Sequence, residues 1–219
     1  MKNSVLQKKL MDLLQDRFTT SDSVLVNFAK GEDAYDPVKS EAVVFPNSNE
    51  ELSEVLKLCN EHKTPVVPYG TGTSLEGHAV GNPNGITISL EKFDKILSVN
   101  AEDFDCRVQA NVTREQLNEY LKDKGVFFPI DPGANAALGG MASCSASGTM
   151  AVKYGTMRTV VMGLTIILAA QIFFYIKWIR DGRNILLGTT YISLTLIVLS
   201  FWRRLMMNDN NRSKLTPFI

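Results

Sequence analysis

Residues 65–78 read PVVPYGTGTSLEGH, an apolar run that ends in a loop rich in glycine and hydroxyl side chains. Val66 and Val67 are typical of the end of a buried strand. The glycines of the loop permit positive φ angles and close backbone approach, and its hydroxyl groups add donors beside freed backbone N–H groups. The pattern therefore predicts either a site for an anionic phosphate or a tight structural turn. It is carried by Gly70, Thr71, Gly72, Thr73, Ser74 and Gly77.

The spacing of these glycines differs from that of two familiar phosphate-binding motifs. It is neither GxxxxGK[ST] nor a GxGxxG that opens a helix, so the usual mononucleotide and Rossmann interpretations both fail.

A second segment, residues 131–158, reads DPGANAALGGMASCSASGTMAVKYGTMR and is too rich in small residues for an ordinary core helix. It predicts a surface on which a flat or extended ligand lies against the backbone, with amide and hydroxyl donors directed at it. The structural alternative is a close contact between a helix and a sheet. Two such segments in one domain favour ligand binding over packing alone. The small residues of this surface are Gly139, Gly140, Ala142, Ser143, Ser145, Ala146, Ser147 and Gly148.

Three stretches of the chain together resemble one known family. They read GTGTSLEGH at 70–78, NAEDFDCRVQANVTREQLNEYLKDKGVFFPIDPGANAALGGMA at 100–142, and ASGTMAVKYGTMR at 146–158. These motifs are similar, in order and spacing, to the FAD-binding half of the D-lactate dehydrogenase (cytochrome) and glycolate oxidase flavoproteins of the vanillyl-alcohol oxidase superfamily. The resemblance runs from about Asp33 to Ala169.

The resemblance implies FAD as cofactor and an α+β fold, a PCMH-type FAD-binding domain of two small mixed subdomains. It also implies oxidation of a D-2-hydroxy acid to the 2-oxo acid, with a cytochrome c-type acceptor. The 68–78 loop would surround the pyrophosphate, and the 131–155 segment would follow the ribityl chain and flavin ring. The resemblance adds Tyr69 and His78 to the pyrophosphate loop. In the second segment it implies Pro132, Gly133, Gly139, Gly140, Ser143, Gly148, Tyr154 and Gly155 as cofactor-binding residues, with Tyr154 closing over the ribityl or adenine side.

Hydrophobic periodicity predicts the helices and strands that would carry these loops. Leucines at positions 6, 10, 13 and 14 predict an amphipathic helix. Capping boxes are expected at Ser48 with Glu51 and at Thr113 with Gln116, the second opening a helix that stops at Gly125. Strands are expected at 42–45, 66–68, 86–90, 96–99 and 106–110.

The composition changes after Ala169, where residues that match the family end. Eighteen uncharged residues at 159–176 and nineteen at 184–202 each approach the thickness of a bilayer's hydrocarbon core, ~27 Å. We expect a transmembrane helix at 184–202 and a second candidate at 159–178, although Val161–Ala169 also matches a family strand. Two interpretations of the tail stay open: a membrane anchor, or the product of a truncated or mis-spliced gene model.

The expected organisation is therefore an N-terminal helix and lead-in at 1–36, an incomplete FAD-binding domain at 37–169 and a hydrophobic tail at 170–219. In the family, the residues that bind substrate and metal and the catalytic histidine lie in the part that this chain lacks. We therefore assign no catalytic residue in this sequence.

The charge balance excludes one class of partner. The 219 residues carry 23 basic and 23 acidic side chains, so there is no basic excess to recruit nucleic acid. The three cysteines contain no CxxC pair and are expected to be reduced thiols. His62 and His78, the sequence's two histidines, are not at metal-ligand spacing, so no metal site is predicted.

Three function classes stay open from the sequence. The first is a flavoenzyme of the D-lactate dehydrogenase type, mitochondrial by resemblance. The second is a non-catalytic or truncated FAD-binding module, tethered to a membrane and lacking the substrate domain. In the third no stable cofactor domain forms, because missing strands leave sheet edges exposed.

Overall fold

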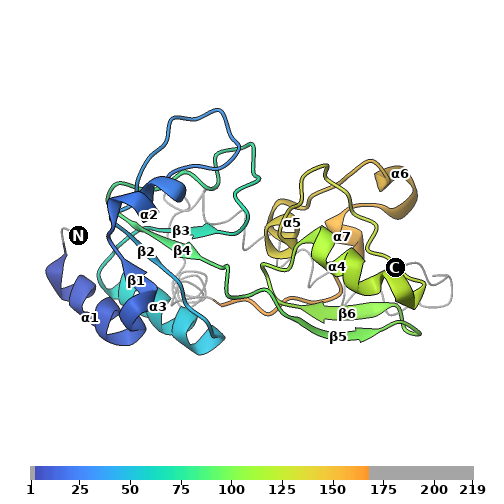
Figure 1. Ribbon diagram of the computed structural model, residues 1–219, viewed down its shortest axis with the longest axis horizontal. Helices are drawn as coiled ribbons and strands as arrows, with labels where there is room; N and C mark the ends of the chain where they lie inside the picture. Colours follow the sequence, from blue (N-terminus) through green and yellow to red (C-terminus); the bar gives the residue numbers. More distant parts are fainter. Residues whose placement is uncertain (1–2, 168–219) are drawn as a thin grey trace, which may run out of the picture. The chain divides into compact units, whose positions relative to one another are not determined.

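The computed structural model describes residues 3–167, and all of them belong to one compact unit of the chain. The elements in chain order are α1 (Ser4–Leu14), η1 (Gln15–Arg17), β1 (Phe18–Thr19), α2 (Asp22–Asn27), β2 (Ala42–Val44), α3 (Asn49–Glu61), β3 (Val66–Tyr69), β4 (Ile86–Ser89), β5 (Ile96–Asn100), β6 (Asp105–Val108), α4 (Arg114–Leu121), η2 (Lys122–Lys124), α5 (Leu138–Cys144), α6 (Ala151–Tyr154) and α7 (Met157–Val160). Helices and strands are mixed in the first part of this order, β3 to β6 follow one another, and the elements after β6 are all helical (Figure 1).

The strands form two separate sheets. In the first, the order is β1-β2-β4-β3, with β2 and β3 parallel to β4 and β1 antiparallel to β2. All residues of β2 and β4 are buried, as expected for parallel strands covered on both faces. The second sheet is the antiparallel pair β5–β6, with a register irregularity between Ile96 and Ser98. The predicted α+β class with a mixed sheet is confirmed.

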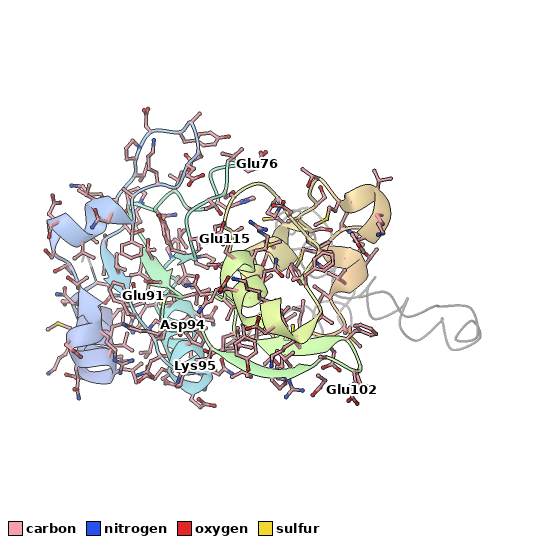
Figure 2. All side chains as sticks on the ribbon, turned by 45° about the vertical axis from the view of Figure 1, so that its right-hand side comes forward. Glu76, Glu91, Asp94, Lys95, Glu102 and Glu115 are labelled. Atoms are coloured by element: carbon pink, nitrogen blue, oxygen red, sulfur yellow. The ribbon has the colours of Figure 1, made fainter. Side chains whose placement is uncertain are left out.

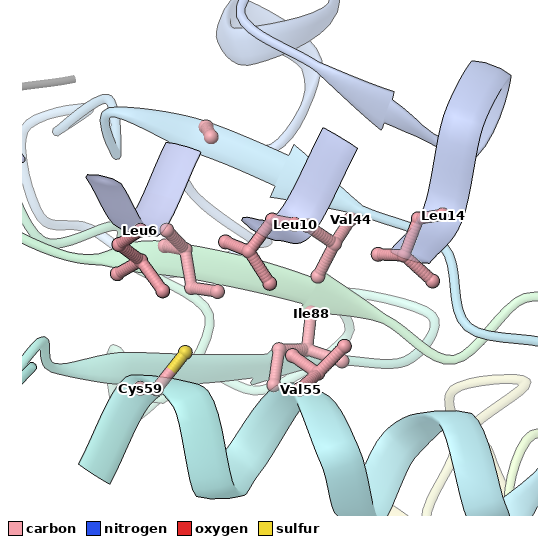
Figure 3. Close-up of a cluster of buried hydrophobic side chains, with 9 residues drawn as sticks. Leu6, Leu10, Leu14, Val44, Val55, Cys59 and Ile88 are labelled. Carbon is pink, nitrogen blue, oxygen red and sulfur yellow. The ribbon is translucent and has the colours of Figure 1, made fainter. Parts of the chain in front are cut away.

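The first hydrophobic core joins α1 and α3 to the first sheet. Leu6, Leu10 and Leu14 recur every four residues on one face of α1 and are fully buried. Figure 3 shows them in one cluster with side chains of α3 and of the strands, among them Val55 and Ile88. The amphipathic helix predicted from the leucine spacing is therefore confirmed, since its apolar stripe faces this core.

A second core lies in the later part of the described chain. It contains Leu117 and Leu121 of α4, Leu138 and Met141 of α5, and Met157 of α7. The segment at 131–158 thus contains a short helix that packs into a core through two large side chains, whereas the small residues had predicted either a ligand surface or a close contact between a helix and a sheet. The reason is that α5 places its two large side chains on one face and its glycines on the others.

Side-chain caps fix the first turns of α4 and α3. The predicted capping box is present at α4, but only half of it forms at α3. At α4 the Thr113 hydroxyl accepts from the Gln116 N–H at 3.2 Å, and the Gln116 side chain accepts from the Thr113 N–H at 3.3 Å. At α3 the Ser48 hydroxyl accepts from the Glu51 N–H at 3.1 Å, but the capping box does not close. The Glu51 carboxylate instead pairs with Arg17, which lies at the end of η1.

Burial of β3 differs from the prediction. Val66 is 36% exposed and Val67 only partly buried, so they are not the end of a buried strand. The reason is topological: β3 lies at the edge of its sheet and pairs with β4 alone. The edge position leaves the loop that follows β3 accessible.

Residues 161–167, the described residues that follow α7, adopt neither of the two predicted structures. Residues 161–167 are not part of a helix or strand, so the strand expected from Val161 is wrong there. A strand persists only where a neighbour completes its hydrogen bonds, and no described strand pairs with this segment. Within residues 3–167 no helix is long and apolar enough to cross a membrane. The rest of the 159–178 candidate and the span predicted at 184–202 lie outside the described residues.

Candidate cofactor site

The loop after β3 is held in shape by backbone contacts from residues 30–32. Gly72 has a φ of +72°, and its carbonyl accepts a hydrogen bond from the Glu32 N–H at 2.9 Å. Tyr69 donates its hydroxyl hydrogen to the Lys30 carbonyl at 3.1 Å. A side chain added to Gly72 would collide with this Tyr69 hydroxyl. The positive φ that the sequence predicted is therefore required here by both conformation and space.

The same loop presents a run of unpaired backbone donors. The N–H groups of residues 70–75 have no hydrogen-bond partner in the described part of the chain. Nearby, the hydroxyls of Thr71 and Thr73 lie 3.2 Å apart, and the Ser74 hydroxyl lies 2.9 Å from Nδ1 of His78. Successive free amides beside hydroxyl groups are a donor set of the kind that binds phosphate.

The charges around the loop are not attractive to an anion. Residues 65–81 contain no lysine or arginine, and Glu76 is exposed on the loop (Figure 2). Burial, together with Asp33 and Glu32, raises the pKa of Tyr69, so its hydroxyl stays protonated and continues to donate. The loop itself therefore offers an anion backbone amides, hydroxyls and the ring of His78, but no lysine or arginine.

In the second segment, the glycines have different roles. A Cβ on Gly139 would stand 2.8 Å from the Cβ of Ala110, and the Gly139 N–H donates to the Ala110 carbonyl at 2.8 Å. A Cβ on Gly148 would collide with the backbone of Asp131. A Cβ on Gly140 would have no heavy atom within 4 Å. The first two glycines allow close packing, whereas Gly140 faces open space.

The two predicted loops meet in the structure. The Thr71 hydroxyl accepts a hydrogen bond from the Ala137 N–H at 3.4 Å. A Cβ on Gly70 would stand 3.4 Å from the Cβ of Ala137. At a second point, Nδ1 of His78 lies 3.8 Å from the sulfur of Cys144, at the end of α5. Segments far apart in the sequence thus form one continuous surface.

Other predicted residues of the second segment have protein partners away from the first loop. The ring of Tyr154 packs edge-on against Phe127, with centroids 5.6 Å apart. Gly155 has a φ of +81° and leaves room for the side chain of Thr159. Ser143 donates to the Gly139 carbonyl at 2.9 Å and is exposed. Their role toward a cofactor stays a prediction.

Pro132 and Gly133 lie in the turn that opens the second segment. Gly133 has a φ of +88°, and its N–H donates to the Asp131 carboxylate at 3.2 Å. Arg114 of α4 approaches the same carboxylate, with Nε 3.7 Å from Oδ1. This ion pair links α4 to the turn, a contact that the sequence analysis did not predict.

Asn111 and Asp33 are further residues of the site region that the sequence analysis missed. Asp33 is 5% exposed, and its carboxylate accepts from the N–H groups of Gly31 and Tyr35 at 3.1 and 3.0 Å. It thereby shapes the segment that contacts Gly72. Asn111 lies against Gly70, with its side-chain oxygen buried and without a partner among the described residues.

A separate hollow of about 760 Å³ lies on the outer side of α4. Its lining includes Glu115, Glu119 and Lys122 but none of the predicted cofactor residues. This hollow is open and lined by charged groups, so it lacks the apolar enclosure typical of a cofactor pocket.

Comparisons with known proteins identify the fold and the family of the chain. The structure resembles that of alkyldihydroxyacetonephosphate synthase with a TM-score of 0.64 at 20% identity, covering 71% of this chain and 33% of that one. That likeness shows the fold. A model described as "FAD binding domain" matches residues 40–171, more than half of the chain. The protein therefore has a FAD-binding fold, and the chain belongs to the FAD binding domain family.

Named relatives show to which group within the family the chain is similar. The chain is 50% identical over 129 residues to "Probable D-lactate dehydrogenase, mitochondrial" of Danio rerio, covering 59% of this chain and 26% of the relative. It is 39% identical over 165 residues to "D-lactate dehydrogenase [cytochrome], mitochondrial" of Arabidopsis thaliana, covering 74% and 29%. The predicted relationship to this group is confirmed. The chain spans between a quarter and a third of the length of these two relatives.

Proposed function

We propose that this chain binds FAD and forms the cofactor-binding part of a D-lactate dehydrogenase of the cytochrome-linked type. The observation that carries the proposal is the hydrogen bond between Thr71 and Ala137, which joins the loop of unpaired amides to the segment of small residues. The family match and the named relatives support the same cofactor and reaction class.

The described residues fit such a cofactor. The free N–H groups of residues 70–75 would bind the diphosphate, because amide donors need no counter-charge to hold an anion. Gly72 allows the backbone curvature, and His78 would add a side-chain nitrogen at the end of the loop. The open surface beside Gly140 would receive the flavin and its ribityl chain.

Bound FAD would supply the two-electron oxidation of a D-2-hydroxy acid to its 2-oxo acid, with a cytochrome c-type protein as final acceptor. The residues of this chain would bind and orient the cofactor and keep water from one side of it. We assign none of them a catalytic role. A mitochondrial location and attachment to a membrane through residues 170–219 are parts of the same proposal.

A second candidate is a FAD-binding module with no dehydrogenase activity of its own. The histidines favour it, because alcohol oxidation commonly needs a positioned base and histidine is the usual one. The sequence has two histidines. Nδ1 of His62 lies 3.1 Å from the side-chain nitrogen of Asn3, and His62 belongs to neither of the two predicted loops. His78 belongs to the predicted phosphate loop.

The test uses the purified full chain and two measurements. An absorbance scan after incubation with FAD should show stoichiometric bound flavin, and a colourless, well-ordered protein would refute the proposal. D-lactate-dependent dye reduction then separates the two candidates. Reduction by the flavin-loaded chain supports the dehydrogenase, whereas bound flavin without reduction supports the binding module. Carbonate extraction of cell membranes tests the attachment through the tail.

A further inference from the structure

Asn111 lies in the short connection between β6 and α4, and its backbone is firmly held. Its N–H donates to the Phe93 carbonyl at 2.8 Å. The carbonyls on either side of it accept hydrogen bonds from α5. Ala110 accepts from the Gly139 N–H at 2.8 Å, and Val112 accepts from the Leu138 N–H at 2.9 Å. The side chain of Asn111 therefore starts from a fixed point beside the second segment.

That side chain reaches the place where the two loops meet. A Cβ added to Gly70 would stand 3.3 Å from Oδ1 of Asn111 and 3.4 Å from the Cβ of Ala137. Gly70 begins the run of unpaired N–H groups, and Thr71 binds Ala137 directly. Asn111 thus adds a side-chain amide to a surface that is otherwise formed by backbone and small residues.

The side-chain oxygen of Asn111 lacks the partner that a buried polar atom normally has. This oxygen, Oδ1, is buried without a hydrogen bond to any described residue. The large majority of buried side-chain polar atoms are paired, so an exception calls for an explanation such as a missing bound molecule. The amide can turn by 180° and present its NH₂ group at the same position, because the two orientations have nearly the same shape.

We propose that Asn111 is a further FAD-binding residue, whose side-chain amide donates a hydrogen bond to the dinucleotide where the two loops meet. This inference rests on the proposed function. A donor suits this position because the loop contains no cation to balance the diphosphate. A hydrogen bond to a charged group is also stronger than one between neutral groups.

The test measures FAD affinity and stability in the full-length chain. Asn111→Leu keeps the branched shape and removes the amide, and should raise the Kd for FAD about tenfold or more. Asn111→Asp should raise it further, because a carboxylate repels the diphosphate. The cofactor-free Asn111→Leu protein should melt at or above the wild-type temperature, since no internal hydrogen bond is lost. If Asn111 only supported the fold, Asn111→Leu would lower the melting temperature and leave the Kd for FAD unchanged.

Asn118→Leu is the matched control. The Asn118 amide is fully used within the fold, accepting from the Phe128 N–H at 2.7 Å and donating to the Phe128 carbonyl at 3.2 Å. This variant should lower the melting temperature and leave the Kd unchanged.

Three results would overturn the inference in distinguishable ways. If the wild type binds no FAD, the proposed function fails and the inference fails with it. If the wild type binds FAD and Asn111→Leu binds within twofold of it, the inference alone fails. If Asn118→Leu weakens binding as much as Asn111→Leu, the effect acts through folding and Asn111 is not a contact.

Discussion

Thr71 and Ala137 are 66 residues apart in the sequence, yet the hydroxyl of the first accepts a hydrogen bond from the backbone N–H of the second. This bond links the loop after β3 to the start of α5. The proposed site depends on this link, because it brings the unpaired amides of the first loop next to the small residues of the second segment.

We therefore predict that Thr71→Val weakens FAD binding. Valine keeps the side-chain shape but removes the bond that holds the two loops together in the free protein. FAD binding must then restore their arrangement at a cost of about 1–2 kcal/mol, or roughly a five- to thirtyfold rise in Kd. Fluorescence titration of FAD measures the change. Thr71→Ser retains the hydroxyl and should bind within about threefold of the wild type. Equal binding by the valine variant would show that the two loops hold their positions without this bond.

Gly72 offers a test of the loop's conformation with a close internal control. Gly72→Val should abolish measurable FAD retention, because valine is strained at a φ of +72° and its side chain collides with the Tyr69 hydroxyl. Gly125 has the same φ of +72°, but no heavy atom lies within 4 Å of an added Cβ. Gly125→Val therefore measures backbone strain alone.

The two glycine variants should differ in whether they retain flavin. Gly125→Val should lose about 1–2 kcal/mol of unfolding free energy and keep its flavin. Retained yellow colour and a normal Kd in Gly72→Val would count against the loop as the diphosphate site.

The ion pair between Arg17 and Glu51 predicts a dependence of stability on pH. Hydrogen bonds from Arg17 hold the pKa of Glu51 below its ordinary value of 4.5. A group with a lowered folded pKa stabilises the protein fully above its unfolded pKa. That contribution should therefore be complete above about pH 4.5 and be lost as the pH falls through the lower, folded value.

Urea unfolding at a series of pH values tests this. Glu51→Gln should reduce the unfolding free energy by about 1 kcal/mol at neutral pH and flatten the decline below pH 4.5. Glu50→Gln, which alters the neighbouring exposed residue of α3, should keep the wild-type slope. If both variants keep that slope, the pair does not contribute to the pH dependence.

The core facing α1 gives a prediction about stability alone. Leu10 is fully buried, whereas the adjacent Met11 is 48% exposed. Leu10→Ala should cost about 3 kcal/mol, because it leaves a cavity between α1 and the first sheet. Met11→Ala should change the unfolding free energy by less than about 0.5 kcal/mol. Similar losses in both variants, measured by urea unfolding, would mean that α1 does not pack through the leucine face.

The sequence predicted elements best where periodicity or local capping determines them. The leucines of α1 and the capping box at Thr113 depend on residues only a few positions apart, so a short window contains the whole signal. The position of β3 in its sheet is not local information. Val66 was predicted as buried because valine is common in buried strands, but the strand order places it at an edge.

The candidate site shows the same division between local and distant information. The glycine-rich composition of both loops was visible in the sequence, but their meeting at Thr71 and Ala137 was not. Asn111 and Arg114 gave no signal, because each acts through a residue brought near by folding. Glu51 was assigned to a capping box for a similar reason, since Arg17 is distant in sequence and competes for its carboxylate.

Gly139 and Gly140 are adjacent in the sequence, and the structure gives them different roles that mutation can separate. Gly139→Ala should destabilise the protein by about 1–3 kcal/mol, because the new methyl group meets Ala110 in a close contact. Gly140→Ala should stabilise the cofactor-free protein by up to about 1 kcal/mol, since alanine favours the helix and meets no neighbour.

Gly140→Leu should keep this stability and yet weaken FAD binding more than tenfold, because the side chain occupies the proposed flavin surface. Melting curves and FAD titration on the three variants measure both quantities. Undiminished FAD binding by Gly140→Leu would exclude this face of α5 from the cofactor site, while a stable Gly139→Ala protein would exclude the close contact with Ala110.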